Sequence, residues 1–511
     1  MRVRKGPFCW ILVGFVLVGL VDSGYLTLEH FRPSTDVVCL TNFWSDCGRV
    51  LKSSYSEIWG IPLALFGFIH YSFLLSSLLF GVGWVVVLLS AWGALVSVYL
   101  VYLQVGIIGK ICIYCMVSAI TSFLIFGMTQ MNFGNERKRA VVKFTHWIYK
   151  RFRPVLFLIS SDTIHERMVG LGEWLGRNGF LKKVLGWLYD FEDESLEMEL
   201  MGIKFKNPVG LAAGFDYEGK LTQILPVMGF GYQTVGTVTN MAYEGNPRPR
   251  LGRLVRSRSL LVNKGFKSSG VHKLAAKLGR IDFDGIVGVS VGRTNSAKLV
   301  TQKQSVEDIV AAFKTLEKSK IKHSYYELNI SCPNLIHAGK VTFYEPKELN
   351  KLLVAVDKLK LSRPVLIKMP ITESEKATLA MLKVVVRHKM AGVVIGNLWK
   401  DRGSKDFNKA EVEGVGIGNF SGKPTFRRSN ELIDLAYKHF GKKLTIVGCG
   451  GVFTGADAYE KIKRGASLIQ MVTGLVYEGP QQVAKINMEL LELVRKDGYK
   501  SVSEAVGRGV L

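Results

Sequence analysis

Four apolar stretches dominate the first quarter of the chain and contain almost no charged residues. They cover residues 8–21, 59–80, 84–105 and 112–131. The last three are long enough to cross a bilayer as helices, and the first reaches that length when it is extended through Leu28. From Asn132 onward charged residues are frequent and the periodicity is that of a water-soluble protein. The pattern predicts an all-α bundle of four transmembrane helices followed by a globular domain.

The first stretch has a second interpretation, because "MRVRK" followed by a short apolar run also fits a cleaved signal peptide. However, no small-residue cleavage site follows cleanly, and three more apolar stretches do. We therefore interpret it as the first transmembrane helix.

In the globular part, short apolar runs alternate with helical patterns eight times. The runs are "VGLAAG", "YQTVGTVT", "IVGVSVG", "YYELNIS", "PVLIKMP", "AGVVIGN", "LTIVGCGG" and "SLIQMVTG". Apolar strands separated by helices imply a parallel sheet that is covered on both faces. Eight such units over about 300 residues predict a closed (β/α)8 TIM barrel, whose active site lies at the carboxyl ends of the strands. A doubly wound open sheet is the alternative, disfavoured because no G-x-G-x-x-G follows the first strand.

The formal net charge of +25 is partly local. The stretch "NERKRAVVKFTHWIYKRFRP" holds seven Lys or Arg and one Glu directly after the fourth apolar stretch. Together with "MRVRK", it places a basic flank at each end of the bundle, which predicts that both ends face the cytoplasm. Nucleic-acid binding is the rival interpretation, and it is weaker because no nucleic-acid motif accompanies the run.

Four of the seven cysteines fall on the predicted outer side of the membrane. Cys39 and Cys47 lie in the first loop, and Cys112 and Cys115 form "CIYC" at the start of the fourth stretch. Two such pairs can pass electrons by thiol–disulfide exchange, one meeting a soluble partner and the other a lipid-soluble acceptor. Zinc is the alternative, disfavoured by the uneven spacing, so no metal site is predicted. Cys9 is interpreted as a small buried apolar residue.

The ends of the predicted strands carry candidate ligand groups. Glycines follow the seventh and eighth strands, where backbone N–H groups of this fold approach a phosphate. Lys368 is alone in the apolar "VLIKMP", which favours a partner for an anion or for an electron-rich cofactor ring. Asn329 and Asn334 can hold a polar planar ligand by paired hydrogen bonds.

The N-terminal motifs resemble the vitamin K epoxide reductase family. The resemblance is carried by "CLTNFWSDCGRVLKSSYSEIWGIPLALFG" and "CIYCMVSA" and covers roughly residues 8–130. It implies that Cys39 and Cys47 shuttle electrons, while Cys112 and Cys115 form a quinone-facing redox centre. The thioredoxin-like domain that often accompanies this family is not found in the sequence, so we expect a separate periplasmic thioredoxin-like dithiol protein as donor.

The remainder, from about Arg153, resembles the membrane-associated, quinone-reducing dihydroorotate dehydrogenases. The motifs are "NPVGLAAGFD", "GNPRPRLGRL", "NISCPN", "FSGKP" and "GASLIQMVTG". The resemblance implies FMN as cofactor, quinone as electron acceptor and oxidation of dihydroorotate to orotate in pyrimidine biosynthesis. The positions that would contact FMN are Ala213, Gly214, Thr237, Asn329, Lys368, Gly422, Gly451 and Thr473.

Two further roles follow from this resemblance. Residues 153–176 resemble a small helical cap that admits quinone, and they are amphipathic enough to lie on a membrane surface. Arg253 is the candidate for the quinone end, with a solvated loop arginine as the alternative. Cys332 falls at the position of the catalytic base, which is usually serine in the quinone-linked class. A thiolate is a competent base near neutral pH if its pKa is lowered, and a small apolar residue is the alternative.

Several positions depart from the family pattern. Tyr217 occupies a position where a lysine is expected, and Ser290, in the third strand, occupies a position where an asparagine is expected. The substrate loop reads "NKGF", one residue short, and Gly396 and Leu398 replace the expected threonines. Losing a cation and hydroxyl donors weakens recognition of orotate, which presents a carboxylate and an imide. The substrate-binding candidates are Asn263, Gly265, Phe266, Asn334 and Asn397.

We therefore expect three parts: a transmembrane domain over 1–131, a basic linker and membrane-associated cap over 132–200, and an FMN-binding barrel over 201–511. The expected location is the inner membrane, with the barrel on the cytoplasmic side. Both halves would deliver electrons to one quinone pool. The alternatives are an FMN oxidoreductase acting on a different pyrimidine-like ring, and a degenerate membrane-anchored binding module.

Overall fold

A computed structural model describes the chain except for residues 1–6, 33–43, 133 and 511. Contacts divide the chain into two compact units, Met1–Val141 and Val142–Leu511. We refer to them as the helical unit and the barrel unit and describe each by itself.

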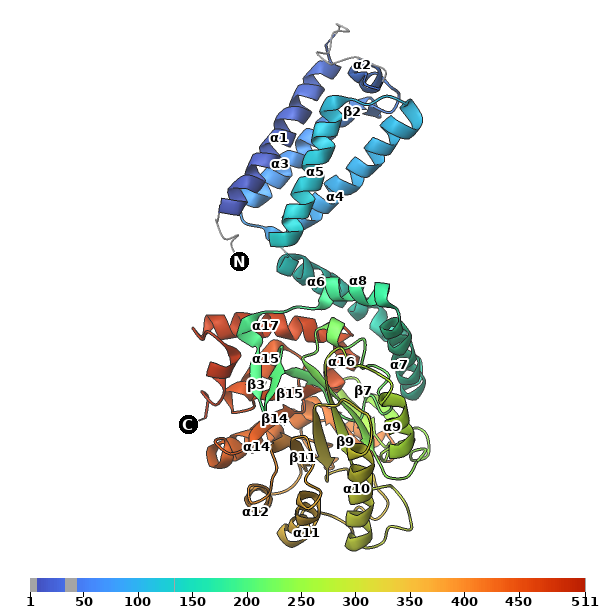
Figure 1. Cartoon of the computed structure of the whole chain (residues 1–511), viewed down its shortest axis with the longest axis vertical. Helices are drawn as coiled ribbons and strands as arrows, with labels where there is room; N and C mark the ends of the chain where they lie inside the picture. The colour runs from blue at the N-terminus through green and yellow to red at the C-terminus, as the bar shows by residue number, and fades with distance from the viewer. Residues whose placement is uncertain (1–6, 33–43, 133, 511) are drawn as a thin grey trace. The chain divides into compact units, whose positions relative to one another are not determined.

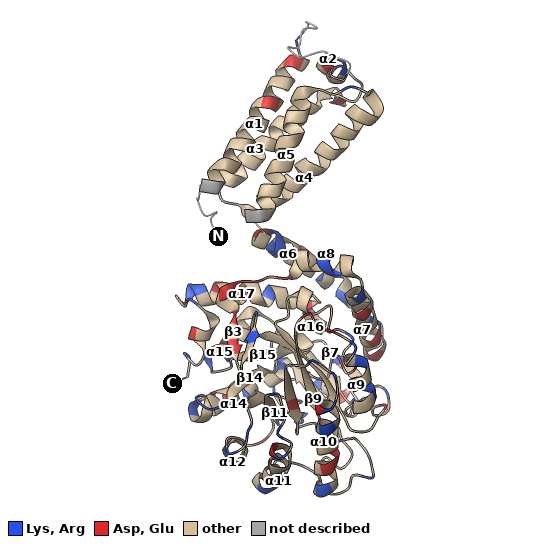
Figure 2. Ribbon diagram, viewed as in Figure 1, with Lys and Arg blue, Asp and Glu red and all other residues tan. Residues whose placement is uncertain are grey.

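The helical unit consists of apolar helices that pack side by side (Figure 1). They are α1 (Pro7–His30), α3 (Leu63–Leu79), α4 (Gly83–Tyr102), which a π-helical turn η1 extends over Leu103–Ile108, and α5 (Ile113–Asn132). Figure 2 shows very few charged residues on them. Three segments are long and apolar enough to cross a membrane, Cys9–His30, Gly83–Ile108 and Ile113–Gln130, while Leu63–Leu79 is a shorter apolar helix. The expected apolar helices are confirmed, and the count of four crossings stays a prediction.

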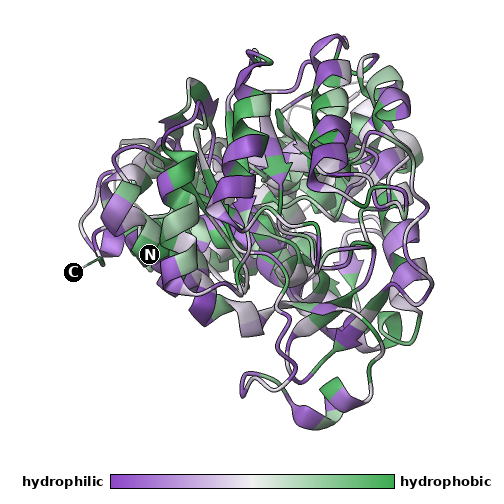
Figure 3. Ribbon diagram, turned by 90° about the horizontal axis from the view of Figure 1, so that it is seen from below, coloured by the Kyte–Doolittle hydropathy of each residue, from purple (hydrophilic) through white to green (hydrophobic). Residues whose placement is uncertain are grey.

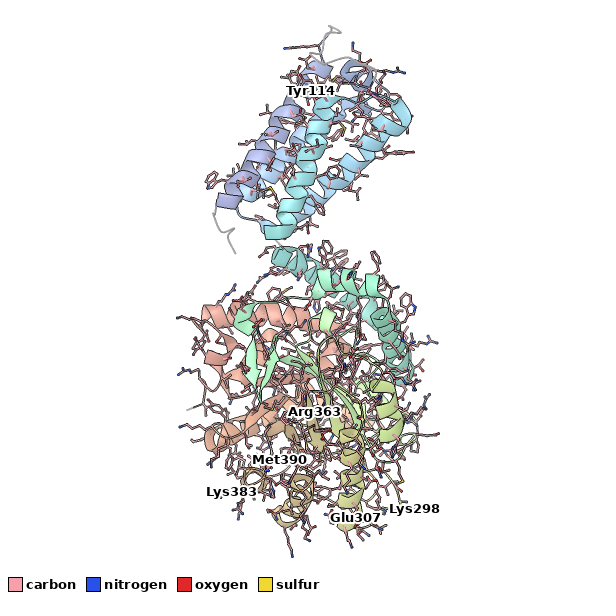
Figure 4. All side chains as sticks on the ribbon, in the orientation of Figure 1. Tyr114, Lys298, Glu307, Arg363, Lys383 and Met390 are labelled. Atoms are coloured by element: carbon pink, nitrogen blue, oxygen red, sulfur yellow. The ribbon has the colours of Figure 1, made fainter. Side chains whose placement is uncertain are left out.

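One end of the helical unit carries the short elements α2 (Cys47–Leu51), β1 (Glu57–Ile58) and β2 (Ile61–Pro62) (Figure 1). The carboxylate of Asp46 caps α2 by accepting a 2.9 Å hydrogen bond from the Arg49 N–H. Tyr114, in the first turn of α5, lies at this same end (Figure 4). The short elements therefore bring the first loop next to the start of α5.

Three amphipathic helices precede the barrel: α6 (Gly134–Leu156), α7 (Ser161–Arg177) and α8 (Gly179–Tyr189). Side chains of Ser160 and Asn178 cap α7 and α8 by accepting backbone N–H groups, which sets where each helix begins. The C-terminal part of α6 is tied to the barrel by the Tyr149 hydroxyl, which donates a 2.7 Å hydrogen bond to the Val476 carbonyl.

Eight parallel strands close into a barrel in the order of the eight apolar runs. They are β5 (Val209–Leu211), β6 (Tyr232–Val238), β9 (Ile286–Val291), β10 (Tyr325–Asn329), β11 (Val365–Met369), β12 (Gly392–Ile395), β14 (Thr445–Cys449) and β15 (Leu468–Met471). The predicted TIM barrel is confirmed, and the open doubly wound sheet is excluded because β15 pairs with β5.

Helices cover the outside of the barrel with one apolar and one polar side, which is visible as green and purple in Figure 3. They are α9 (Val271–Leu278), α10 (Gln302–Glu317), α11 (Pro346–Asp357), α12 (Glu375–Val385), α14 (Phe426–Phe440), α15 (Gly455–Lys463), α16 (Thr473–Glu478) and α17 (Gln482–Lys496). Since the strands are covered from outside and filled from inside, β6, β10 and β11 are buried along their whole length.

Short elements outside the barrel were not anticipated. A hairpin, β3 (Met198–Leu200) and β4 (Ile203–Phe205), precedes β5, and its Phe205 packs with the apolar residues inside the barrel. A three-stranded antiparallel sheet joins β7 (Leu251–Leu254), β8 (Ser259–Val262) and β13 (Asn419–Gly422), which comes far later in the chain. The remaining elements are α13 (Lys409–Glu413) and the 3₁₀ turns η2 (Glu194–Leu196), η3 (Pro226–Met228), η4 (Lys423–Thr425) and η5 (Val502–Ala505).

Candidate active site

A cavity opens at the carboxyl ends of the barrel strands, where the sequence places the chemistry. It holds about 970 Å³ of space between atoms, including open solvent at its mouth. Every residue predicted to contact the cofactor lines this cavity: Ala213, Gly214, Thr237, Asn329, Lys368, Gly422, Gly451 and Thr473. Of the other candidates, Cys332, Gly265, Phe266, Asn334 and Asn397 also line it. The structure thus brings together residues from strands that are far apart in the sequence.

A buried ion pair forms one wall of the cavity. Lys368 Nζ lies 3.4 Å from Glu327 Oε1, and both side chains are buried. The same carboxylate accepts hydrogen bonds from Ser290 Oγ at 3.2 Å and from Gln470 Nε2 at 3.0 Å. Burial acts to lower the pKa of the Lys368 ammonium, but the Glu327 carboxylate more than offsets it, and the pKa is raised. Lys368 is therefore a fixed cation that faces the ligand space.

Sequence reasoning missed Glu327. The signal was available, since Glu327 is the one charged residue in "YYELNIS", as Lys368 is in "VLIKMP". Adjacent parallel strands β10 and β11 carry the two residues at nearly the same level, with Asn329 opposite Lys368. A lone charge on each of two neighbouring buried strands indicates an ion pair, because an unpaired buried charge is costly.

A chain of polar side chains continues from this pair. Ser290 Oγ lies 2.9 Å from Thr237 Oγ1, which in turn accepts a 2.9 Å hydrogen bond from Asn329 Nδ2. Asn397 Nδ2 donates to Ser331 Oγ at 2.5 Å. Ser290, which replaces the expected asparagine, therefore acts within the wall and does not itself line the cavity.

Two glycines with positive φ line the cavity. Gly214 has φ +102°, and a Cβ there would meet no atom within 4 Å, so a side chain at this position would project into the cavity. Gly396 has φ +133°, and a Cβ there would lie 2.0 Å from the Cys449 carbonyl oxygen. Only glycine permits β12 to pass so close to β14, which is why the threonine expected at 396 does not fit this backbone.

Cys332 lies in the cavity wall, and its thiol is not activated there. Burial raises the pKa of Cys332 to about 11, although a backbone hydrogen bond from Asn334 and the charges of Arg293 and Lys368 act in the opposite direction. The lowered pKa that a thiolate base would need near neutral pH is absent, because the charges of Arg293 and Lys368 do not offset the desolvation of the thiol.

The substrate-loop candidates divide between two cavities. Asn334 reaches the main cavity, where its Nδ2 donates to the Val262 carbonyl at 2.9 Å and its Oδ1 accepts from Asn419 Nδ2 at 2.5 Å. Asn263 instead lines a more open neighbouring cavity, and its Oδ1 accepts a 2.8 Å hydrogen bond from Asn246 Nδ2. Asn263 therefore supports the loop rather than facing the main cavity.

Lys264 is a second residue that sequence reasoning did not single out. It is buried, lines the main cavity, and holds its Nζ 4.4 Å from the centroid of the Tyr217 ring. Tyr217 and Leu398, two of the departures from the family pattern, also line the cavity. The signal in the sequence was a lysine that directly follows the apolar run "SLLVN".

A second, apolar cavity lies between the barrel and helices α7 and α8. It holds about 1690 Å³ of space, including open solvent, and shares five lining residues with the main cavity: Gly214, Val262, Lys264, Ser421 and Val472. Arg253 lines it, donating from Nη1 to the carbonyls of Phe157 and Ile159 at 2.9 Å each. Arg253 thus ties the segment before α7 to β7 at the wall of this cavity.

Three cysteines of the helical unit gather at one end. Cys112 and Cys47 are buried in one cluster with Val50, and Cys115 packs against it. Cys47 is disulfide-bonded, whereas Cys112 and Cys115 are free thiols, with the Cys115 N–H 3.4 Å from Cys112 Sγ. Cys39 lies outside the described residues. Over the described part of the chain, no group of three or more His, Cys, Asp and Glu residues is placed to hold a metal ion.

The fold and the cavity define the class of the molecule: a (β/α)8 barrel whose strand ends surround a cavity with several polar side chains, joined to an apolar helical unit. Family comparison is more specific. Residues 195–494 match the family model described as dihydroorotate dehydrogenase, and residues 10–130 match that of the vitamin K epoxide reductase family. The chain belongs to the dihydroorotate dehydrogenase family and carries a vitamin K epoxide reductase family domain at its N-terminal side. Both resemblances are confirmed, and with the apolar helices they indicate a membrane-associated protein.

Individual relatives agree with this assignment. The dihydroorotate dehydrogenase (quinone) of Mycobacterium sp. (strain KMS) is 35% identical over 359 residues, covering 70% of this chain and 98% of the relative. The enzyme of the same name from Acaryochloris marina (strain MBIC 11017) is 34% identical over 373 residues, with the same coverage. The crystal structure of the Eimeria tenella enzyme with ferulenol has a TM-score of 0.60 at 23% identity, covering 68% of this chain and 95% of that one. The ligand-free enzyme has a TM-score of 0.59 at 25% identity, covering 66% and 98%.

Proposed function

We propose that the barrel unit is a quinone-linked dihydroorotate dehydrogenase that uses FMN and serves pyrimidine biosynthesis. The reaction is dihydroorotate plus quinone giving orotate plus quinol. The main support is one observation: a cavity at the strand ends that contains polar side chains such as Lys368 and Asn329, and an apolar cavity under α7 and α8, share part of their walls. A flavin between a polar and an apolar substrate needs such a pair of cavities.

FMN fits the residues of the main cavity. Open backbone at Gly214 leaves room for a flat ring, and the Lys368 ammonium faces the same space. Gly422, Gly451 and Thr473 line the part of the cavity near the ends of β14 and β15, where this fold binds phosphate. When bound, FMN would accept the hydride from C6 of dihydroorotate.

The protein residues have separate tasks in this proposal. Asn329, Asn334 and Asn397 would orient the substrate ring by paired hydrogen bonds. Cys332 would remove the proton from C5 as a thiolate, after its thiol has released its own proton to solvent at the cavity mouth. Since burial raises the pKa of Cys332 to about 11, only a small fraction of the thiol would be ionised near neutral pH, which would slow this step. Arg253 would lie beside the quinone, in the wall of the apolar cavity.

The segment around α6, α7 and α8 is proposed to lie on the membrane surface. It exposes large apolar side chains along its helices: Phe144, Trp147, Phe152, Leu158, Trp174, Phe180 and Trp187. Aromatic side chains at the level of the lipid headgroups are typical of interfacial helices. Quinone would then enter the apolar cavity directly from the bilayer.

For the helical unit we propose thiol oxidation coupled to quinone reduction. Cys112 and Cys115 would be oxidised to a disulfide, and two electrons and two protons would pass to quinone. The Cys39 and Cys47 pair would exchange disulfides with a periplasmic thioredoxin-like dithiol protein. Packing of Cys47 against Cys112 supports this relay. The basic flanks support an inner-membrane location with the barrel in the cytoplasm and the thiols outside.

Anaerobic flavin absorbance tests the barrel reaction. Dihydroorotate is added to the detergent-solubilised full-length protein, followed by a soluble quinone analogue. Bleaching followed by recovery is expected. A yellow flavin that stays oxidised would exclude dihydroorotate and favour another pyrimidine-like ring, an alternative that Leu398 and Tyr217 in the cavity wall support. Purified protein that contains no flavin would favour the binding-module alternative.

A further inference from the structure

Lys264 presents a buried ammonium group to the ligand space. Only 7% of the residue is exposed, yet it lines the main cavity, the apolar cavity and a third, polar cavity beside α7. Among the described residues, none forms a hydrogen bond or ion pair with its Nζ. Burial lowers the pKa of Lys264 to about 7. A buried ammonium without an anion is costly, so this position favours a ligand that supplies one.

The two carboxylates whose charges act on Lys264, those of Asp162 and Glu166, make their hydrogen bonds and ion pairs with other residues. Asp162 accepts a 2.9 Å hydrogen bond from the Arg250 N–H. Glu166 lies 3.2 Å from Arg248 Nη2 and 3.5 Å from Lys267 Nζ. The other lysine of the main cavity, Lys368, already has Glu327 at 3.4 Å. Among the described residues that line this cavity, Lys264 is therefore the cation that can pair with an incoming anion.

Tyr217 and the short loop hold Lys264 in place. The ring of Tyr217 lies under the ammonium at 4.4 Å, a distance at which a ring face attracts a cation. Directly after Lys264 the chain turns through Gly265, at φ +65°, and Phe266, at φ +59°. Both residues line the main cavity, so this tight turn keeps Lys264 at its wall. Tyr217 occupies the position where the family pattern has a lysine.

We propose that Lys264 binds the carboxylate of the ring substrate, replacing from the loop after β8 the cation that Tyr217 removes after β5. Lys264 is thus a specificity-determining residue that makes the pocket select an anionic pyrimidine-like ring over a neutral one. The inference rests on the proposed function and extends it, because it accounts for recognition of a carboxylate despite Tyr217.

Binding of two rings to the oxidised, flavin-loaded full-length protein tests this. Orotate carries the carboxylate, and uracil is the neutral ring without it. Affinities are measured by calorimetry, with flavin absorbance as a second signal. In Lys264→Gln, orotate is expected to bind about 10- to 100-fold more weakly, since a charge-assisted hydrogen bond is lost. Uracil affinity is expected to change by less than about twofold.

The matched control is Lys267→Gln, which removes the same charge from the same loop but from a lysine paired with Glu166. It should bind both rings as the unchanged protein does. The rescue variant is Lys264→Gln combined with Tyr217→Lys, which returns a cation from the neighbouring position in the same wall. It should recover part of the orotate affinity. Such a recovery is not expected if Lys264 only supports the structure of the loop.

The outcomes separate this inference from the proposed function. If the unchanged protein binds no orotate, both the substrate and the role of Lys264 are wrong. If it binds orotate and Lys264→Gln binds it equally well, only the role of Lys264 is wrong. Equal weakening of orotate and uracil would also contradict it, because the effect is then not specific to the carboxylate. Should Lys264→Gln fail to fold, Tyr217→Leu serves instead, with an expected orotate-specific loss of about threefold from weaker positioning.

Discussion

The two units build their candidate redox centres in different ways. In the helical unit the reactive groups are Cys112 and Cys115, which lie three positions apart, so that the motif itself brings them together. In the barrel unit the cavity residues Ala213, Lys368 and Thr473 come from β5, β11 and β15 or from just after them, and only closure of the barrel makes them line one cavity. A centre based on covalent sulfur chemistry needs little surrounding structure, whereas a centre that holds a ring by charge and hydrogen bonds needs a complete wall.

This contrast predicts that the two activities can be removed independently. Cys112→Ala with Cys115→Ala should abolish quinone reduction by added dithiol, because no redox pair remains next to the acceptor. Dihydroorotate oxidation with a soluble quinone analogue should be unchanged. Both rates are measured spectrophotometrically on the same detergent preparation. Loss of the two activities together would show that the barrel depends on the thiols.

The converse change affects the barrel alone. Cys332→Ala should slow bleaching of the flavin by dihydroorotate about 10²- to 10⁴-fold, since general base catalysis is lost. The dithiol activity should persist. Stopped-flow absorbance under anaerobic conditions gives the rate, and a loss of less than tenfold would assign the base to another group.

Cys332 also predicts a pH dependence. Its pKa of about 11 lies above the working range, so the thiol is protonated at neutral pH. The thiolate fraction, and with it the bleaching rate, should rise about tenfold for each pH unit between 7 and 10. In Cys332→Ser this rise should disappear, because the hydroxyl does not titrate in that interval. A flat profile in the unchanged protein would mean that substrate binding lowers the pKa.

The wall of the barrel site should be sensitive to loss of one partner of its ion pair. Lys368→Met leaves Glu327 as an unpaired buried charge and should lower the free energy of unfolding of the barrel unit by about 3–5 kcal/mol. Thermal unfolding followed by tryptophan fluorescence and flavin release measures it. Adding Glu327→Gln should restore much of the stability without restoring flavin binding. If the single variant is as stable as the unchanged protein, the pair does not support the wall.

The smallest expected effect concerns Leu398, which lines the main cavity at a position where the family pattern has threonine. Leu398→Thr adds a hydroxyl that can reach a polar ring. We expect the KM for dihydroorotate to fall about two- to fivefold, with kcat unchanged. A rise in KM would indicate that Leu398 contributes apolar contact to a different ring.

The sequence by itself determined the barrel strands and the apolar helices, though not the short elements outside the barrel. Apolar runs at the length of strands, separated by amphipathic segments, predicted each of the eight barrel strands, because burial on both faces leaves its mark on consecutive residues. Charge-free stretches predicted the apolar helices for the same local reason. Residues at strand ends, such as Asn329 and Lys368, could be placed at one cavity since the carboxyl ends of parallel strands meet at one edge.

Tertiary structure alone decided what these residues do to one another. Glu327 as the partner of Lys368, the turn of Asn263 away from the main cavity, and the sheet that joins β13 to β8 all depend on contacts between distant segments. The raised pKa of Cys332 and the burial of the Lys264 ammonium depend on the atoms that surround them. The periodicity of the sequence indicates which residues are buried, but it does not indicate which buried groups face each other. The chemistry of this site depends on which groups face each other.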